Sequence, residues 1–424
     1  MQKARFSNSK SFFGFWAVLC LLGSFALNTA HATNGYFSHG YGIKYKGLAG
    51  AGVALRLGPL GPATNPAALA FGKKHYDVSL SFFNPNRQYT VTGNPSLQPG
   101  TFGLAPGTVE SGSTLFVIPS LAANWSLNDN TAFGISIYGN GGMNTNYDHP
   151  TFGFKPTGVD LSQLFIAPTL ALKAGAKHSF GLTPILSYQR FEANGLLAFG
   201  PFSSAAGKLS NNAHSNSFGF GARLGYLGEW MDFLSVGASY QTKVKMGEFD
   251  DYAGLFAGQG DFDIPANWTV GVALGFEQMG LAFDIQQMMY SDIKSVGNPM
   301  LPNLQRARLG NDNGAGFGWK DMTVFKGGVY FQTSGGWTWR AGYSFGKQPI
   351  PESEVLFNIL APGVIEQHLT VGFSKALRGE KEISFVAMRA FSNSVSGGNP
   401  LDFPGQQTIE LKMDQWEFGV GFSF

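Results

Sequence analysis

The last nine residues, Trp416-Glu417-Phe418-Gly419-Val420-Gly421-Phe422-Ser423-Phe424, decide the fold of this chain. Apolar side chains occupy every even position and small or polar residues occupy the odd ones, which is the period-two pattern of a β-strand with two unlike faces. A terminal amphipathic strand that ends in an aromatic residue resembles the signal read by the outer-membrane assembly machinery. The stretch predicts a strand whose apolar face lies against lipid.

The same alternation recurs along the chain, as in 76–82, 268–276, 337–345 and 368–374. A soluble β-sandwich would alternate too, but its polar faces would carry many charges. Here the less apolar face is mostly Gly, Ser, Thr and Ala, aromatic residues gather at strand ends, and only 13% of all residues are charged. These features favour a membrane barrel with lipid outside, a semi-polar lumen and aromatic girdles at both interfaces.

The pattern predicts an all-β membrane protein, a 14-stranded antiparallel outer-membrane β-barrel, because an even number of strands lets the ring close antiparallel. The predicted strands cover residues 76–90, 111–126, 131–147, 160–174, 179–195, 215–229, 234–249, 262–278, 280–295, 319–333, 336–348, 364–376, 381–393 and 409–424. Eight strands already enclose an interior that side chains can fill. A barrel of this width is therefore either an open pore or plugged.

Residues 1–32 have the parts of an export signal. Three basic residues precede the apolar run 12–26, and Ala30-His31-Ala32 supplies the small residues of a cleavage site. A transmembrane anchor is the alternative, but the run is short for a helix that crosses a bilayer. We expect this segment to be a signal peptide that is removed.

The only cysteine, Cys20, lies within the predicted signal, so the mature chain would have no thiol, disulfide or cysteine-based metal site. Of the 29 Lys and Arg residues, three lie in the signal, which leaves 26 against 27 Asp and Glu. This balance gives no indication of a nucleic-acid partner. The seven histidines are dispersed, so we expect no metal and no cofactor.

Residues 33–74 lack alternation and are rich in Gly and Ala, as in the stretch 47–54. Such a segment has no core of its own, but its small residues could pack closely against the inner wall of a barrel. We predict that it forms an N-terminal hatch, or plug, inside a transmembrane barrel made by residues 75–424. A flexible tail in the periplasm is the alternative.

Three features of this region resemble the hatch of the FadL/TodX family of outer-membrane transporters: Asn34-Gly35-Tyr36-Phe37, the Gly/Ala stretch, and Asn65-Pro66-Ala67-Ala68-Leu69. The similarity extends over the mature chain and includes Trp337–Tyr343 followed by Pro349-Ile350-Pro351. It implies passive transport of long-chain fatty acids or aromatic hydrocarbons in the outer membrane of a Gram-negative bacterium. It does not decide between these two classes of ligand.

In that family the Asn-Pro-Ala turn packs near an inward kink of the third strand, which interrupts the wall and makes a lateral opening. The third predicted strand here runs into Gly139, Asn140, Gly141 and Gly142, and glycine within a strand marks a bulge or bend. We predict the kink and the lateral opening at these four residues, braced by the turn Asn65–Ala67. An ordinary transition into an extracellular loop is the alternative.

Strand parity predicts which charged side chains face the lumen. The expected cations, which are candidates for binding the carboxylate head of a ligand, are Arg223, Lys243, Lys245, Lys326 and Arg340. The expected acids are Asp77, Asp284 and Glu417. Pairing of the cations with these acids or with hatch carbonyls is the alternative. Parity places Arg190 outside, where lipopolysaccharide phosphate is the natural partner.

Other functions fit the sequence less well. His214-Ser215-Asn216 suggests a barrel phospholipase, but its surroundings lack the spacing of a nucleophile held by its base, so we expect no enzyme. The main alternative is a general aqueous porin or a structural outer-membrane protein, and a porin would have a charged constriction without a plug. We expect a monomer whose partners are a hydrophobic small molecule, outer-membrane lipid, lipopolysaccharide and the barrel assembly machinery.

Overall fold

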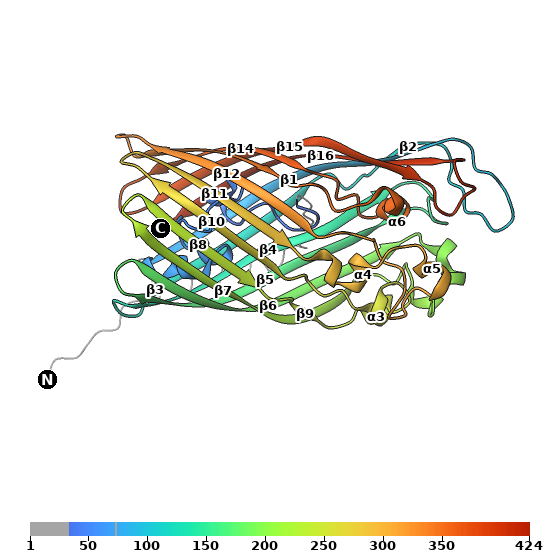
Figure 1. The fold of residues 1–424 in the computed structure, drawn as a ribbon, viewed down its shortest axis with the longest axis horizontal. Coiled ribbons are helices and arrows are strands. Elements are labelled where there is room, and N and C mark those ends of the chain that lie inside the picture. Colours follow the sequence, from blue (N-terminus) through green and yellow to red (C-terminus); the bar gives the residue numbers. More distant parts are fainter. Residues whose placement is uncertain (1–33, 73) are drawn as a thin grey trace.

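The computed structural model describes residues 34–72 and 74–424, and the predicted signal peptide lies outside them. The described chain forms an antiparallel sheet that closes on itself, because β1 (His75–Thr92) pairs with β16 (Thr408–Ser423). Wall strands that follow one another in the sequence are neighbours in the ring, which is an up-and-down barrel (Figure 1). The predicted antiparallel barrel is confirmed.

Among the described residues there are sixteen strands, of which fourteen form the wall. The other two, β2 (Gly107–Glu110) and β9 (Lys245–Met246), are short extensions that pair with β1 and β7. The remaining wall strands are β3 (Phe116–Ser126), β4 (Thr131–Tyr147), β5 (Thr157–Ala174), β6 (His178–Asn194), β7 (Ser215–Met231), β8 (Leu234–Gln241), β10 (Asn267–Gly275), β11 (Met279–Met288), β12 (Met322–Gln332), β13 (Trp337–Phe345), β14 (Gln367–Ala376) and β15 (Glu382–Gly398).

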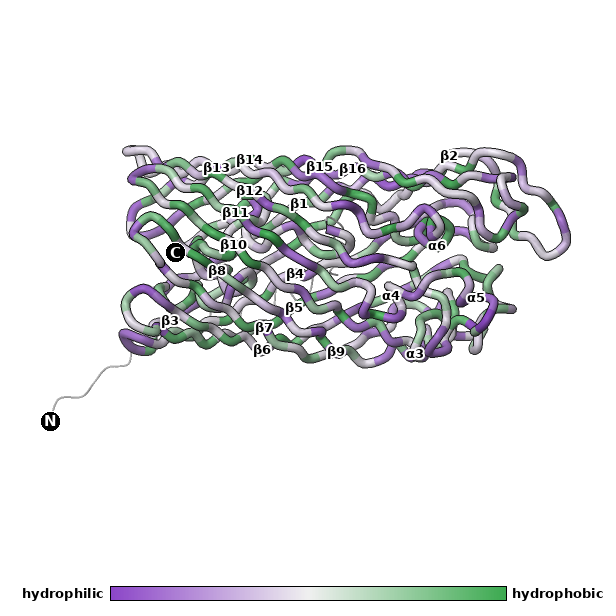
Figure 2. Tube along the Cα trace, viewed as in Figure 1, coloured by the Kyte–Doolittle hydropathy of each residue, from purple (hydrophilic) through white to green (hydrophobic). Residues whose placement is uncertain are grey.

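Side chains alternate across the wall as the sequence predicts. In β16 the side chains of Trp416 and Phe418 are exposed on the outer face, whereas Glu417 between them is buried. Figure 2 shows hydrophobic residues recurring along β7, β8 and β10. An apolar outer surface suits lipid, and each backbone polar group can be satisfied by the neighbouring strand.

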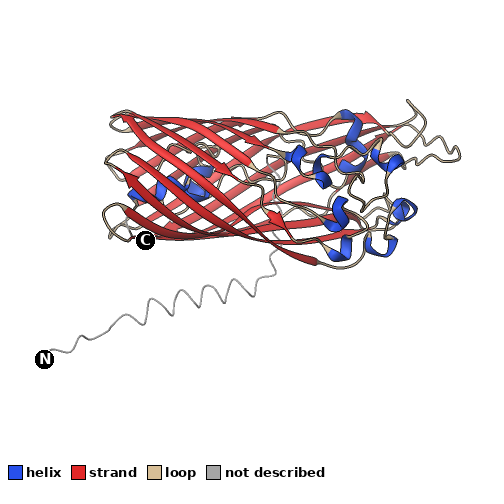
Figure 3. Cartoon of the chain, turned by 60° about the horizontal axis from the view of Figure 1, so that its bottom comes forward, coloured by secondary structure: helices blue, strands red, loops and turns tan. Residues whose placement is uncertain are grey.

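The two ends of the barrel differ. Short turns join β3 to β4, β5 to β6 and β7 to β8, whereas long segments join β6 to β7 and β11 to β12 at the other end, where most helices lie (Figure 3). Outer-membrane barrels have short periplasmic turns and long extracellular loops, which places the helix-rich end outside the cell. These helices are η3 (Leu197–Phe202), η4 (Ala206–Lys208), η5 (Asp250–Tyr252), α3 (Ala257–Gly260), η6 (Tyr290–Asp292), α4 (Lys294–Gly297), α5 (Asn303–Arg306), η7 (Glu352–Glu354) and α6 (Val355–Asn358).

Residues 34–72, the N-terminal segment, lie within the ring of strands (Figures 1 and 3). The segment contains α2 (Ile43–Lys46), η1 (Gly61–Ala63) and η2 (Pro66–Phe71). Its backbone and side chains bond to inward-facing residues from opposite parts of the wall, including Thr370 of β14 and Arg223 of β7. Most of its residues are buried.

Several of the predicted strands are shorter than expected, including the second and the seventh. The strand predicted at 111–126 begins at Phe116, and the strand predicted at 234–249 ends at Gln241 and resumes as β9. Gln241 opposes Arg223 of β7, but Met246 opposes Gly219, so one extra residue lies between the two paired parts. An extra residue of this kind is a bulge, and it reverses which side chains point inward.

Removing Phe424 should lower the yield of assembled barrel several-fold. The backbone of Phe424 exchanges two hydrogen bonds with Tyr76, at 2.8 and 3.0 Å, and the two rings stack with centroids 5.4 Å apart. The deletion therefore removes contacts that close the ring between β1 and β16. Gel mobility of unheated and heated outer-membrane fractions measures the folded fraction. The control is Phe403→Ala, because this loop side chain is exposed; equal assembly of the shortened chain and the control would contradict this role.

Candidate functional site

The hydrogen-bond ladder of the wall is interrupted between β3 and β4. The two strands pair from the periplasmic turn only as far as Ser120, which opposes Tyr138. Beyond this point β4 still pairs with β5 on its other side, with a register shift between Gly139 and Gly141. The extra residue is Asn140, so a β-bulge lies within the segment predicted to kink.

Part of the N-terminal segment occupies the side of β4 that β3 leaves unpaired. Phe37 forms an isolated bridge with Gly141. The amide of Ser38 donates to the carbonyl of Asn140, and the amide of Gly142 donates to the carbonyl of Tyr36, both at 3.0 Å. A Cβ on Gly141 would lie 1.9 Å from the Tyr36 carbonyl oxygen, so this close approach requires glycine.

The side chain of the bulged residue Asn140 points inward and is fully buried. Its Oδ1 accepts a hydrogen bond from the Tyr41 hydroxyl at 2.8 Å, and its Nδ2 donates to Gln163 Oε1 at 2.8 Å. Since Tyr41 belongs to the N-terminal segment and Gln163 to β5, the bulge links that segment to the intact side of the wall.

The turn Asn65–Ala67 lies in another part of the barrel. The Asn65 side chain accepts from the amide of Ala67 at 3.0 Å and donates to the carbonyls of Val53 at 2.7 Å and Tyr226 at 2.8 Å. A Cβ on Gly225 would lie 2.1 Å from Asn65 Oδ1, so glycine in β7 makes room for the turn. The expectation that this turn braces the interrupted third strand is wrong, because 36–38 lie there instead.

A series of aromatic rings leads from the interrupted ladder toward the extracellular loops. From Tyr36 the path runs to Phe262 at 6.1 Å between ring centroids, then to Phe256 at 4.8 Å and Phe191 at 4.7 Å. All these rings are buried. The seven residues of this aromatic column are Tyr36, Phe37, Phe191, Phe256, Phe262, Tyr290 and Trp319.

Phe191 and Phe256 also line an apolar cavity of about 40 Å³ among the extracellular loops. Apolar cavities of this kind stay dry and bind apolar guests. The aromatic column thus begins at an apolar cavity and ends where β4 is no longer paired with β3. The other large apolar residues that line this cavity are Val159, Leu196, Phe199, Leu255, Leu309, Phe317, Phe357 and Leu360.

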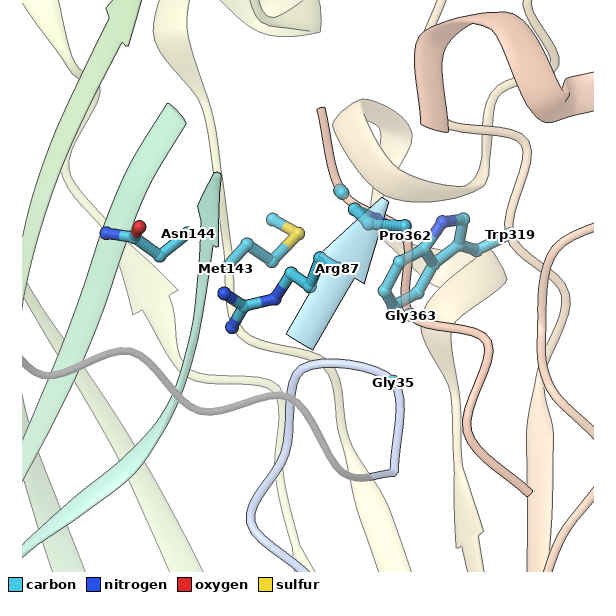
Figure 4. A pocket seen from close by; sticks show the side chains of 8 residues that line it. Gly35, Arg87, Met143, Asn144, Trp319, Pro362 and Gly363 are labelled. Atoms are coloured by element: carbon cyan, nitrogen blue, oxygen red, sulfur yellow. The ribbon is translucent and has the colours of Figure 1, made fainter. Parts of the chain in front are cut away.

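A second cavity, of about 10 Å³, lies beside Trp319 of the aromatic column. Figure 4 shows Arg87 of β1 between Met143 and Trp319, with Gly35 of the N-terminal segment close by. Arg87 is 3% exposed, its Nη1 donates to a backbone carbonyl at 3.2 Å, and its Nη2 has no partner in the described structure. Asn144 Oδ1 is buried and unpaired at the same place. A buried cation with a free donor can hold an anionic or polar head group.

Arg87 is not among the cations predicted from the sequence, although its side chain lies on the same inward face of β1 as Ser79 and Ser81. The period-two numbering of the strand was the signal that could have found it. The cavity itself could not be predicted from the pattern of β1, because Met143 and Trp319 come from β4 and from the segment after α5.

Arg223 and Lys326 are buried on the inner face, as expected. Arg223 donates to the carbonyl of Ala63 and to the hydroxyl of Tyr138, the latter at 3.1 Å. Lys326 donates to the carbonyl of His39 at 3.1 Å. Both cations therefore bond to backbone carbonyls of the N-terminal segment, which is the alternative to a direct role in ligand binding.

Arg340 is also buried on the inner face, and its Nη1 donates to Ser374 Oγ at 2.7 Å. Lys243 and Lys245, by contrast, are exposed, and Lys243 pairs with Asp263 at 3.0 Å. The expectation that these two lysines face the lumen is wrong. The bulge between β8 and β9 shifts the alternation by one residue, so the inward positions pass to the residues next to them.

Two of the three predicted lumen acids contact the N-terminal segment, whereas Asp77 accepts a hydrogen bond from Ser423 Oγ of β16 at 3.0 Å. Glu417 pairs with Lys46, and Asp284 accepts from the amides of Gly52 at 2.8 Å and Val53 at 2.9 Å. These contacts join β16 and β11 to the same segment from different parts of the ring. They give the segment a defined position inside the barrel.

The rim near β5 and β6 carries a group of charges. Arg190 pairs with Asp160 at 3.3 Å, and His214 contacts Asp160 at 3.0 Å and Glu192 at 3.2 Å. Within residues 34–72 and 74–424, no group of three or more His, Cys, Asp or Glu side chains could hold a metal ion. No helix in the same residues has the length and apolarity needed to cross a membrane.

A closed antiparallel barrel with lipid-facing apolar side chains is the architecture of a bacterial outer-membrane protein. The chain belongs to the family of outer membrane protein transport proteins (OMPP1/FadL/TodX), which it matches over residues 20–383. The predicted family and outer-membrane location are confirmed. No curated protein matches the sequence.

Solved structures of the same architecture include two toluene transporters and a FadL homologue. The Pseudomonas putida toluene transporter TodX is 18% identical, with a TM-score of 0.66 over 91% of this chain and 98% of that one. A Pseudomonas aeruginosa FadL homologue is 15% identical, with a TM-score of 0.69 over 92% and 99%. The Ralstonia pickettii toluene transporter TbuX is 18% identical, with a TM-score of 0.58 over 90% and 98%. At these identities the likeness shows the fold.

Gly141→Ala should loosen the N-terminal segment from β4. The added Cβ would lie 1.9 Å from the Tyr36 carbonyl oxygen, so the two hydrogen bonds to 36–38 should break, at a cost of about 1–3 kcal/mol. Limited proteolysis in detergent should cut the variant within this segment faster than the unchanged protein. The control is Gly327→Ala in β12, whose Cβ would have its nearest contact at 3.7 Å. Equal cleavage of both variants would contradict the contact's importance.

Proposed function

We propose that this protein carries hydrophobic molecules passively across the outer membrane, with entry at the extracellular loops and lateral exit into lipid between β3 and β4. The observation that carries the proposal is the aromatic column, which joins an apolar cavity to the interrupted ladder. A hydrophobic ligand would gain about 0.8 kcal/mol for each buried CH₂ along this route. Lateral exit avoids returning that surface to water.

The role of gate falls to Tyr36–Ser38. These residues fill the side of β4 that lacks β3, and they are held to β4 by two backbone hydrogen bonds. Displacing so short a stretch is far easier than separating two full strands, because few hydrogen bonds break. The bulge at Asn140 keeps β3 and β4 from pairing beyond it, so a gap would remain when the gate moves.

The N-terminal segment as a whole serves as the hatch. Contacts from Lys46 to Glu417 and from Asp284 to the amides of Gly52 and Val53 support a seated plug that stops water and ions. An aqueous porin is the competing function, and it would need an open lumen.

Deleting residues 34–72 should turn the closed barrel into a pore that conducts ions in planar bilayers. The segment's contacts with several wall strands would be lost, and water would fill the lumen. The control lacks residues 95–101, which belong to an outer loop rather than to the segment. Low conductance of the deleted barrel would contradict the hatch, and high conductance of the unchanged protein would favour the porin.

Arg87 is our candidate for the contact with a ligand's polar head. Arg87 and Asn144, each with an unpaired polar atom, line a cavity that also touches Trp319 of the aromatic column. A fatty acid could place its carboxylate beside Arg87 and its chain along the column, whereas a hydrocarbon such as toluene would leave the cation unpaired. Among proteins of this fold are a FadL homologue and transporters of toluene, so both ligand classes deserve a test.

Uptake of labelled oleate and labelled toluene by cells that lack their own transporter tests the function and the head group together. Expression of the chain should raise uptake of at least one ligand, and Arg87→Met should lower oleate uptake about tenfold while sparing toluene, since a charge-assisted hydrogen bond contributes about 1.5–3 kcal/mol. The control is Arg378→Met, in an exposed periplasmic turn. No uptake of either ligand would contradict the proposed function, and equal loss for both would exclude a head-group role.

The proposed partners other than the ligand would contact the terminal strand and the outer rim of the barrel. The terminal strand would be recognised by the barrel assembly machinery, and Arg190 on the outer rim would meet lipopolysaccharide phosphate, although Asp160 already neutralises part of its charge. Because the barrel closes within one chain, a monomer suffices for transport. No catalytic step is needed for passive transport along a gradient.

A further inference from the structure

A polar cavity of about 20 Å³ lies between the N-terminal segment and the inner wall. None of its lining residues belongs to the aromatic column. His39 and Thr64 line it from the segment, and Arg223, Thr269 and Lys326 line it from β7, β10 and β12. A single water needs about 10–15 Å³ by this measure, so the cavity has room for one small ion or one to two waters.

The charges around this cavity are unbalanced. Its lining contains two cations, Arg223 and Lys326, and no carboxylate. Within the part of the chain that the structure describes, Lys326 donates only to the His39 carbonyl, and the partners of Arg223 are neutral oxygens, including Gln241 Oε1. Asp284 opposes Lys326 in the ladder, but it is bonded to two backbone amides and forms no ion pair with Lys326 in the described structure.

Buried cations are costly unless a negative charge lies close to them. Lys46 and Glu417 neutralise one another, and Asp284 opposes Lys326 in the ladder, so Arg223 is left without a carboxylate partner in the described structure and one positive charge is in excess. We propose that the cavity binds one small monovalent anion, such as chloride, between Arg223 and Lys326. The inference does not depend on which molecule the protein transports.

The surrounding groups suit an anion. Thr269 of β10 carries a hydroxyl donor, and Asn267 and Gln286 of β10 and β11 carry amide donors at the same cavity. Since the N-terminal segment supplies one side of the site and the wall supplies the other, the anion can bind with full contacts only when the segment is seated. Binding therefore stabilises the seated segment by mass action.

Bromide in place of chloride tests the site on the unchanged protein. Anomalous scattering from crystals grown in bromide should show a peak in the cavity beside Lys326 and Arg223. In detergent, the unfolding midpoint should rise saturably with halide by roughly 2–4 °C relative to gluconate at equal ionic strength, because gluconate is too large for the cavity. The halide shift should disappear in Lys326→Met and persist in the control Lys245→Met, whose side chain is exposed outside the lumen.

If Lys326→Met does not fold, the bromide crystals and the halide series on the unchanged protein still decide the question. A cavity without an anomalous peak, together with equal midpoints in bromide and gluconate, would overturn the proposal. Displacement of the bromide peak by a long-chain acid would also overturn it, because the cavity would then belong to the carboxylate of a transported ligand.

Discussion

Within a bilayer, every backbone amide and carbonyl must find its partner inside the protein, and the rest of this structure depends on that constraint. The fourteen wall strands satisfy it by closing through β1 and β16. Between β3 and β4 the ladder stops early, and the unpaired edge of β4 finds partners in Tyr36–Ser38 and, further along, in Gly112, whose amide donates to the carbonyl of Asn146. An edge left bare in lipid would cost several kcal/mol for each polar group.

Because Tyr36–Ser38 take the place of β3 as hydrogen-bond partners of β4, they couple the wall to the proposed hatch. A movement that frees the edge of β4 must also move Tyr36, whose ring belongs to the aromatic column, so the proposed exit and the proposed ligand path would change together. The more distant contacts, Lys46 with Glu417 and Asp284 with the amides of Gly52 and Val53, can stay in place while a few residues shift. On this account the hatch has an anchored part, and its gate is the stretch beside Gly141.

Much of the fold could be predicted from period-two alternation, because each strand of a barrel wall has one face toward lipid and one toward the lumen, and its residues alternate accordingly. The faces of Trp416 and Glu417 follow from that rule alone. It failed at Lys243 and Lys245, because one bulged residue between β8 and β9 reverses parity without changing composition. Predicting the bulge would have required the register with β7, which is a contact between strands.

The site was less predictable than the wall. Glycines in the sequence indicated the bulge in β4. The residues that cover the bulge could not be predicted from the sequence of β4 itself: Phe37 lies there, and the turn Asn65–Ala67 packs on β7 instead. The inward direction of the Arg87 side chain could be predicted from strand parity. The cavity that it lines could not, because Met143 and Trp319, which line it as well, are far from Arg87 in sequence. Cavities are made by several elements at once, so a pattern within one element does not contain them.

The most direct test of a moving gate is a disulfide that locks it. Ser38→Cys and Asn140→Cys places thiols on opposing residues of an antiparallel contact, where Cα atoms are about 4.5–5.5 Å apart, within the range that a disulfide spans. Cys20, in the predicted signal, is the only native cysteine. Oxidation should stop uptake of hydrophobic ligand and reduction should restore it. Undiminished uptake with the disulfide formed would contradict the account.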